Sequence, residues 1–176
     1  MPELLGQAEL ITVPSYRLLT VRDQDNDAGL GADEAITQAQ ASNAASTGFE
    51  LVISCAQDLL PVSATLEAWS AHPVESSDPV WSAPQTFELE CPSGLLELSS
   101  PTGDALGTEL PTGPGLYAVE VAHHGREQAL AARQEVLEHE DIIGRQQALT
   151  DARPGGFEKY RIRMWLVGTL PNDEDE

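Results

Sequence analysis

The chain has 176 residues, of which 29 are acidic and nine are basic, so its formal net charge is −20 at pH 7. Such an acidic surface repels phosphate groups, and we therefore expect no direct binding to nucleic acid. No apolar run reaches the ~20 residues that a membrane helix needs, and the N-terminus lacks the basic and apolar regions of a signal peptide. These features predict a cytoplasmic protein that does not bind membranes.

The negative charge is unevenly distributed along the chain. Residues 1–125 contain 18 acidic and two basic residues, a net charge of −16, whereas four of the nine basic residues lie between Arg153 and Arg163. An acidic surface attracts a basic protein partner. It also serves simply to keep a protein soluble, as in an acidic proteome, so the charge alone leaves both interpretations open.

Short strand patterns dominate the first hundred residues. Residues 9–22 predict two strand pieces separated at Pro14, because proline interrupts the hydrogen bonding of a sheet. A short helix is predicted at 33–45, with Asp33 as its N-cap. The loop predicted at 72–84 contains three prolines. Apolar residues alternate with polar ones in the remaining predicted strands, 48–56, 62–71, 85–91 and 94–99.

The clearest strand patterns lie at 113–126 and 157–168, where apolar and polar side chains alternate with a period of two. We expect these two strands to pair. Residues 127–153 between them are helical in composition, and Gly144 is the position where this helix is expected to bend or end. Because the helix separates two strands that look like neighbours, we interpret it as an insertion before the last strand.

Together these elements predict a mainly-β fold, an antiparallel β-sandwich of jelly-roll type with a short N-terminal helix and the helical insertion. We expect residues 1–170 to form one domain and residues 171–176 to be a disordered acidic tail. Cys55 and Cys91 lie in strand-like segments. Free, buried thiols are expected there, because cytoplasmic chains rarely keep a disulfide.

Asp23, Asp25 and Asp27 alternate with other residues like the start of a calcium-binding loop. The EF-hand pattern needs glycine at its sixth position and glutamate at its twelfth. Here Glu34 stands at the twelfth position, but the sixth position is Ala28, so the required glycine is missing. A solvated turn is therefore the favoured interpretation, with calcium binding as the alternative.

A metal-dependent enzyme would have to use His123, His124 and His139. Neighbouring strand residues face opposite sides of a sheet, and no zinc-binding motif accompanies these histidines. Two polar histidines at a strand end are the favoured interpretation. Because no nucleophile is recognisable beside a base, we predict a protein that is not an enzyme and that needs no metal or other cofactor.

Five side chains are candidate partner contacts. Glu88 and Glu90 share one face of a predicted strand, and three residues share one face of the last strand, namely Arg161, Arg163 and Trp165. Arginine and tryptophan are frequent anchors in protein interfaces. In the alternative interpretation the glutamates keep the chain soluble, and the arginines pair with a glutamate such as Glu120 on a neighbouring strand, at up to ~1 kcal/mol for each pair.

The order of the elements resembles the competence protein J (ComJ) family, small acidic bacterial inhibitors of the DNA-entry nuclease NucA. Residues 127–153 depart from the family pattern. The resemblance implies a non-catalytic protein that blocks a nuclease, with acidic residues in place of nucleic acid phosphates. The matching segments are ELITVPSYRLLTVRD (9–23), ADEAITQAQASNAASTGFELVIS (32–54), LPTGPGLYAVEVAHHGR (110–126) and EKYRIRMWLVG (158–168).

We therefore expect a non-catalytic acidic binding protein, an inhibitor or immunity protein whose partner is a basic bacterial nuclease or toxin. The alternative is a structural component that docks on another protein through the helix at 127–153.

Overall fold

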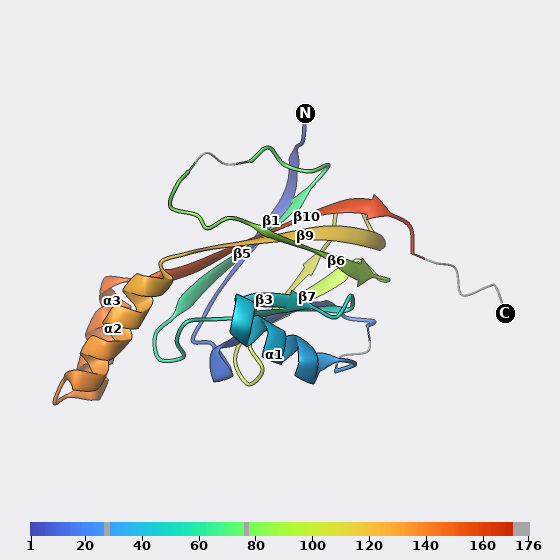
Figure 1. Ribbon diagram of the computed structural model, residues 1–176. Helices are drawn as coiled ribbons and strands as arrows, with labels where there is room; N and C mark the ends of the chain where they lie inside the picture. Colours follow the sequence, from blue (N-terminus) through green and yellow to red (C-terminus); the bar gives the residue numbers. More distant parts are fainter. Residues whose placement is uncertain (27–28, 76–77, 171–176) are drawn as a thin grey trace.

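Figure 1 shows the computed structural model of the chain, which describes residues 1–26, 29–75 and 78–170. Its strands form two five-stranded sheets. Sheet A has the order β1-β5-β10-β9-β6, and sheet B has the order β3-β4-β2-β7-β8. The strands are β1 (Leu4–Thr12), β2 (Leu18–Asp23), β3 (Ala44–Ser46), β4 (Glu50–Ser54), β5 (Val62–Trp69), β6 (Gln85–Cys91), β7 (Leu95–Ser99), β8 (Ala105–Glu109), β9 (Gly115–His124) and β10 (Glu158–Gly168).

The predicted mainly-β fold is confirmed, but the prediction that all strands are antiparallel is wrong in sheet A. Strand β10 pairs antiparallel with β9, as expected, and parallel with β5 on its other side. Period-two alternation predicts which face of a strand is buried and contains no information about the direction of its neighbour. The finer assignment to a jelly-roll-type sandwich stays a prediction.

The two strand pieces predicted around Pro14 are present as β1 and β2, with a short 3₁₀-helix η1 (Ser15–Arg17) between them. They belong to different sheets, so the interruption is the point where the chain crosses from sheet A to sheet B. Strand β8 lies between the predicted strands 94–99 and 113–126, where no strand was predicted, because its sequence ALGTE has few strand-forming side chains.

The predicted helix near the N-terminus is α1 (Ala32–Ser42), which follows two strands rather than starting the chain. Its N-cap is Gly31, in a left-handed conformation with φ of 74°, and Asp33 lies in the first turn instead. Small side chains on α1 pack on the outer surface of sheet B. This contact consists of Ala35 and Ala39 with Leu18, Ala45 and Val52.

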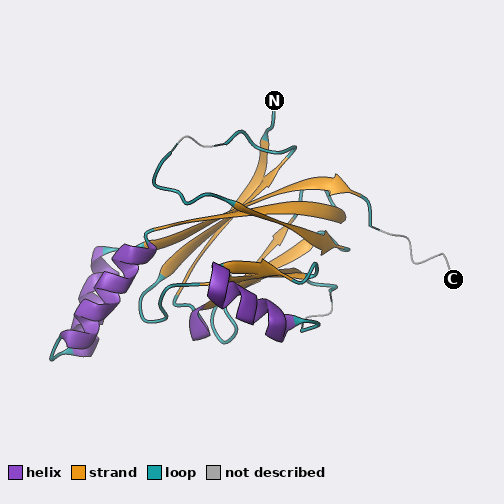
Figure 2. Cartoon of the chain, viewed as in Figure 1, coloured by secondary structure: helices purple, strands orange, loops and turns teal. Residues whose placement is uncertain are grey.

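Side chains from both sheets form one apolar core between the sheets. Leu19 and Leu51 of sheet B and Val119 and Ile162 of sheet A belong to it and are fully buried. Figure 2 shows that the helices lie outside the space between the sheets. A core shared by both sheets is what one domain requires, and the extent of the domain over residues 1–170 stays a prediction.

The predicted helical insertion forms two helices, α2 (Arg126–Glu138) and α3 (Ile142–Ala152), which make a hairpin that projects from one end of the sheets (Figure 1). The break falls at 139–141 and not at Gly144, which lies in the first turn of α3. Asp141 is the N-cap of α3, and its Oδ1 accepts a hydrogen bond from Gly144 N at 3.0 Å. Because Asp141 caps a helix that begins at Ile142, Gly144 lies inside α3 and does not end a helix.

Cys55 and Cys91 are free thiols in the apolar core, as predicted. Burial raises the pKa of both thiols, that of Cys91 to about 12. Because the thiolate is the reactive form, we expect the native protein to be inert towards Ellman's reagent and both thiols to react after unfolding in guanidinium chloride. Rapid reaction of one thiol in the native protein would contradict this placement.

No helix within the described residues is long and apolar enough to cross a membrane. The predicted acidic tail at 171–176 and Asp27 of the aspartate series lie outside the described residues.

Candidate protein-binding surface

The five predicted contact residues all lie on the outer face of sheet A. Their neighbours along each strand, such as Leu89 and Ile162, point into the core. In the register of the sheet, Glu88 on β6 and Trp165 on β10 both pair with Ala118 on β9, the strand between them. The tertiary structure therefore brings together two groups of residues that are more than seventy positions apart in the sequence.

Access to these five residues differs sharply. Residues 70–75 and 78–84, the described residues of what we call the 70–84 segment, pass over part of this outer face, and Arg163 and Trp165 are only 5% and 8% exposed. His72 lies against Trp165 with ring centroids 4.6 Å apart, and Arg163 Nη1 donates to the carbonyl of Val74 at 3.5 Å. Of the three candidate contact residues on the last strand, Arg163 and Trp165 are therefore covered by another part of this chain.

Arg163 forms a buried ion pair with Glu120 on the adjacent strand. Its Nη2 and Nε lie 2.6 Å and 3.0 Å from Oε2 of Glu120, which is 4% exposed. This is the cross-strand pair that the alternative interpretation expected. In the register of the sheet, Arg163 pairs with Glu67 on β5 as well as with Glu120 on β9. It therefore lies between two acidic residues.

Arg161 is half-buried beside the same segment. Its guanidinium stacks over the ring of Trp81 at 4.7 Å, a cation–π contact. Burial lowers the pKa of Arg161, and the neighbouring Arg163 lowers it further. The contact of Trp81 with Arg161, together with those of His72 and Val74 with β10, therefore holds the 70–84 segment onto sheet A.

Glu88 and Glu90 remain accessible, with Glu88 exposed and Glu90 half-buried. Strand β6 is an edge of sheet A, and its backbone is tied to the 46–50 region of sheet B. Ser46 Oγ donates to the carbonyl of Glu88 at 3.0 Å, and Glu90 N donates to the carbonyl of Gly48 at 2.8 Å. Asn26 Nδ2 adds a hydrogen bond to the carbonyl of Glu90 at 2.6 Å.

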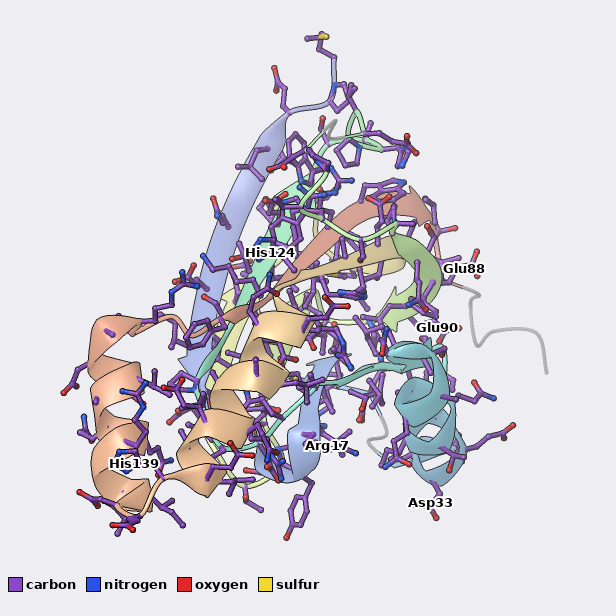
Figure 3. All side chains as sticks on the ribbon, turned by 60° about the vertical axis from the view of Figure 1, so that its left-hand side comes forward. Arg17, Asp33, Glu88, Glu90, His124 and His139 are labelled. Atoms are coloured by element: carbon purple, nitrogen blue, oxygen red, sulfur yellow. The ribbon has the colours of Figure 1, made fainter. Side chains whose placement is uncertain are left out.

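These hydrogen bonds place the two glutamates near other acidic residues at the start of α1 and the start of β4. Figure 3 shows Glu88, Glu90 and Asp33 on the same side of the molecule. A shallow cavity of about 460 Å³ lies beside them, between α1 and the turn before β4, and its lining includes Leu30, Glu34 and Phe49. We call this region the α1–β6 surface; its acidic residues are Asp33, Glu34, Glu50, Glu88 and Glu90.

The electrostatics of the α1–β6 surface are strongly negative. Its cavity is lined by apolar and polar residues and by one acidic residue, Glu34, and none of the described residues that line it is basic. Burial raises the pKa of Glu50, and this effect outweighs the opposing attraction of Arg22. The surface therefore combines an apolar floor with acidic side chains, an arrangement that can bind a basic protein surface.

The aspartate series has a structural role at its first member. Asp23 is completely buried, and its carboxylate accepts hydrogen bonds from Ser93 N, Ser93 Oγ and Gly94 N at 2.7–3.1 Å. Asp25 N donates to the same carboxylate at 2.9 Å. Asp23 thus joins the end of β2 to the turn between β6 and β7, which corrects the expectation that it lies in a solvated turn.

The histidines predicted as alternative metal ligands are not brought together. His123 faces the ring of Tyr160 on the core side, His124 faces Trp81 on the outer side, and His139 lies at the turn of the helical hairpin (Figure 3). Burial lowers the pKa of His123, and Arg126 lowers it further. Within the described residues no cluster of three acidic, cysteine or histidine side chains is arranged to hold a metal ion.

Sequence reasoning missed the acidic residues that α1 and β4 contribute to this surface. Asp33 was predicted as the N-cap of a helix, Glu34 was compared with the last ligand of a calcium-binding loop, and Glu50 was a position in a predicted strand. Each is one of many acids in a chain of net charge −20, so no local signal distinguished them. Only the contact between β6 and the 46–50 region reveals that they share a surface with Glu88 and Glu90.

No protein-family model matches the sequence, and no curated protein matches it. Two solved structures are similar in fold. The crystal structure of ComJ, inhibitor of the DNA degrading activity of NucA, from Bacillus subtilis, has a TM-score of 0.57 at 14% identity and covers 95% of this chain and 99% of its own. A structure titled crocagin biosynthetic gene J has a TM-score of 0.51 at 12% identity and covers 94% and 98%.

These comparisons confirm the resemblance to ComJ that the order of elements indicated, as a remote resemblance in fold. At such low identity a shared fold does not carry a function with it.

Proposed function

We propose that this ComJ-like chain is a non-catalytic inhibitor of a DNA-degrading nuclease. The observation that carries the proposal is the similarity of fold to ComJ over 95% of the chain. The net charge of −20 supports it, because a nuclease that binds DNA offers a positively charged groove. The proposed contact is the α1–β6 surface, whose acidic side chains take the place of DNA phosphates.

The proposed mechanism is electrostatic competition. Carboxylates of the α1–β6 surface approach the arginine and lysine side chains that otherwise bind the DNA backbone, and Phe49 and Leu30 supply apolar contact around the cavity. Opposite charges raise the rate of association, and salt screens them over about 8 Å at physiological ionic strength. Inhibition is therefore expected to weaken as the salt concentration rises, and no chemical step by this chain is required.

The test is an assay of DNA degradation by purified NucA with increasing amounts of the chain. We expect the unaltered chain to inhibit and the double variant Glu88→Lys/Glu90→Lys to inhibit at least about tenfold more weakly, because it reverses two charges in the proposed contact. A matched control, Asp104→Lys/Glu109→Lys, makes the same change in net charge at β8, the opposite edge of sheet B.

The control variant is expected to stay within about threefold of the unaltered chain, because rim charges outside a contact change mainly the long-range attraction. Absence of inhibition by the unaltered chain would overturn the proposed function. Equal losses in both double variants would show that only the overall charge acts, and would remove the α1–β6 surface as the contact.

A further inference from the structure

The helical hairpin of α2 and α3 is a rigid projection whose tip carries exposed apolar side chains. Sequence reasoning left its role open, as an insertion that docks on a partner in some assembly. Its structure supports a more specific role, which rests on the proposed function.

The base of the hairpin is fixed to β10 of sheet A and to β4 of sheet B by a buried polar network. Arg126, the first residue of α2, donates through Nη1 to the carbonyl of Ser54 and to the hydroxyl of Tyr160, each at 2.7 Å. Tyr160 donates in turn to the carboxylate of Glu158, which is fully buried and lies 3.7 Å from the same guanidinium nitrogen. Glu158 also accepts from Ala56 N at 2.7 Å.

An apolar cluster and one further hydrogen bond hold the two helices further along the hairpin, towards its tip. Val136 and Ala132 of α2 pack against Leu60, with Leu149 of α3 beside them. Gln146 Nε2 of α3 donates to the carbonyl of Leu59 at 2.9 Å. With both helices anchored, the tip is held in one orientation, and less conformational entropy is lost when it binds.

The tip exposes large apolar side chains that the hairpin does not use for its own packing. Ile143 is 80% exposed, and Leu137 and Ile142 are each 43% exposed. They lie at the end of α2 and the start of α3, on either side of the turn where Figure 3 labels His139. Exposed apolar groups gathered on a projection are typical of a protein contact.

The charges around these side chains are negative. Glu138, Glu140 and Asp141 flank the apolar tip in the sequence. The nearest arginine, Arg145, is already paired with Glu135 in the described structure. The tip therefore offers an apolar centre with an acidic rim, and its complement is an apolar cleft bordered by lysine or arginine.

We propose that the tip of the α2–α3 hairpin, centred on Ile143, inserts into an apolar cleft with a basic rim on the inhibited nuclease, as a second contact beside the α1–β6 surface. A second copy of this chain is a poor occupant, because two tips of the same charge, on chains of net charge −20, repel each other. A nuclease that binds DNA supplies the basic rim.

The test compares Ile143→Ser with Val167→Ser in the NucA assay. Val167 is 50% exposed at the far end of β10, away from the hairpin, and serves as the matched control. We expect Ile143→Ser to weaken inhibition by at least about tenfold with an unchanged melting temperature, because a central apolar contact is lost from the interface while the core is intact. Val167→Ser is expected to inhibit like the unaltered chain.

The outcomes separate this inference from the proposed function. Inhibition by Ile143→Ser equal to that of the unaltered chain would overturn the tip contact and leave the inhibitor function standing. Failure of the unaltered chain to inhibit NucA would overturn both. Light scattering provides the remaining outcome, since a dimer that Ile143→Ser converts to a monomer would assign the tip to a second copy and overturn the nuclease contact.

Discussion

Replacing Arg163 by alanine is expected to lower the free energy of unfolding by about 3–5 kcal/mol, because it leaves a buried carboxylate without its partner. Glu120 is 4% exposed, and both Nη2 and Nε of Arg163 lie within 3.0 Å of its Oε2. The variant also loses the contact between the guanidinium and the carbonyl of Val74, so the 70–84 segment is expected to loosen. Urea unfolding measures the first effect, and hydrogen exchange of the segment measures the second.

A double variant separates the lost attraction from the cost of an unpaired charge. Glu120→Leu with Arg163→Met keeps side chains of broadly similar size and makes both positions apolar. We expect it to recover most of the loss, because an apolar replacement of a complete buried pair is often neutral or stabilising. If Arg163→Ala alone changed stability by less than about 1 kcal/mol, as for an exposed pair, the buried pair would not be the feature that holds this face.

Replacing Asp23 by alanine is the second change with a large expected effect. The carboxylate accepts four hydrogen bonds, from the backbone of Asp25, Ser93 and Gly94 and from the Ser93 hydroxyl. Because these donors are then left without a partner beside the buried end of β2, we expect a loss of about 3–5 kcal/mol in the free energy of unfolding. Thermal and urea unfolding at neutral pH measure it.

Two milder variants test whether the loss of stability increases with the number of hydrogen bonds that are removed. Ser93→Ala removes one of the four hydrogen bonds to Asp23 and also the hydrogen bond from Leu95 N to Ser93 Oγ, so we expect a loss of about 1–2 kcal/mol. Asp23→Asn keeps the shape but replaces one acceptor oxygen by a donor, so its effect should fall between those of the other two variants. An alanine variant as stable as the parent chain would contradict the role of Asp23 as the link between β2 and the β6–β7 turn.

The alternation of side chains predicted the location of most strands and their buried faces correctly. It placed Glu88 and Glu90 opposite Leu89, and Arg161 and Arg163 opposite Ile162, and the structure has the same arrangement. Alternation works here because each strand has one face towards the shared core, so burial follows the period of two directly. The pairing of β9 with β10 was also predicted, from two strong patterns separated by a helical insertion.

Prediction failed where a residue's surroundings depend on distant parts of the chain. Asp23 looked like a member of a solvated acidic loop, but it is buried because the turn at Ser93 and Gly94 offers it backbone donors. The pairing of Arg163 with Glu120 was one of the expected interpretations, but the covering of Arg163 and Trp165 by another part of the chain was not expected. The residues next to Asp23, Arg163 and Trp165 in the sequence do not indicate these tertiary contacts.

The sequence by itself determined the mainly-β character, the burial pattern of the strands, the helical insertion and the strong negative charge. These properties depend on the side chains of each segment and on their spacing. The tertiary structure alone decided that β10 runs parallel to β5, that the 70–84 segment lies over the arginines, and that α1, β4 and β6 share one acidic surface. Such arrangements depend on contacts between distant segments, and a strand pattern specifies a buried face but not the neighbour that covers it.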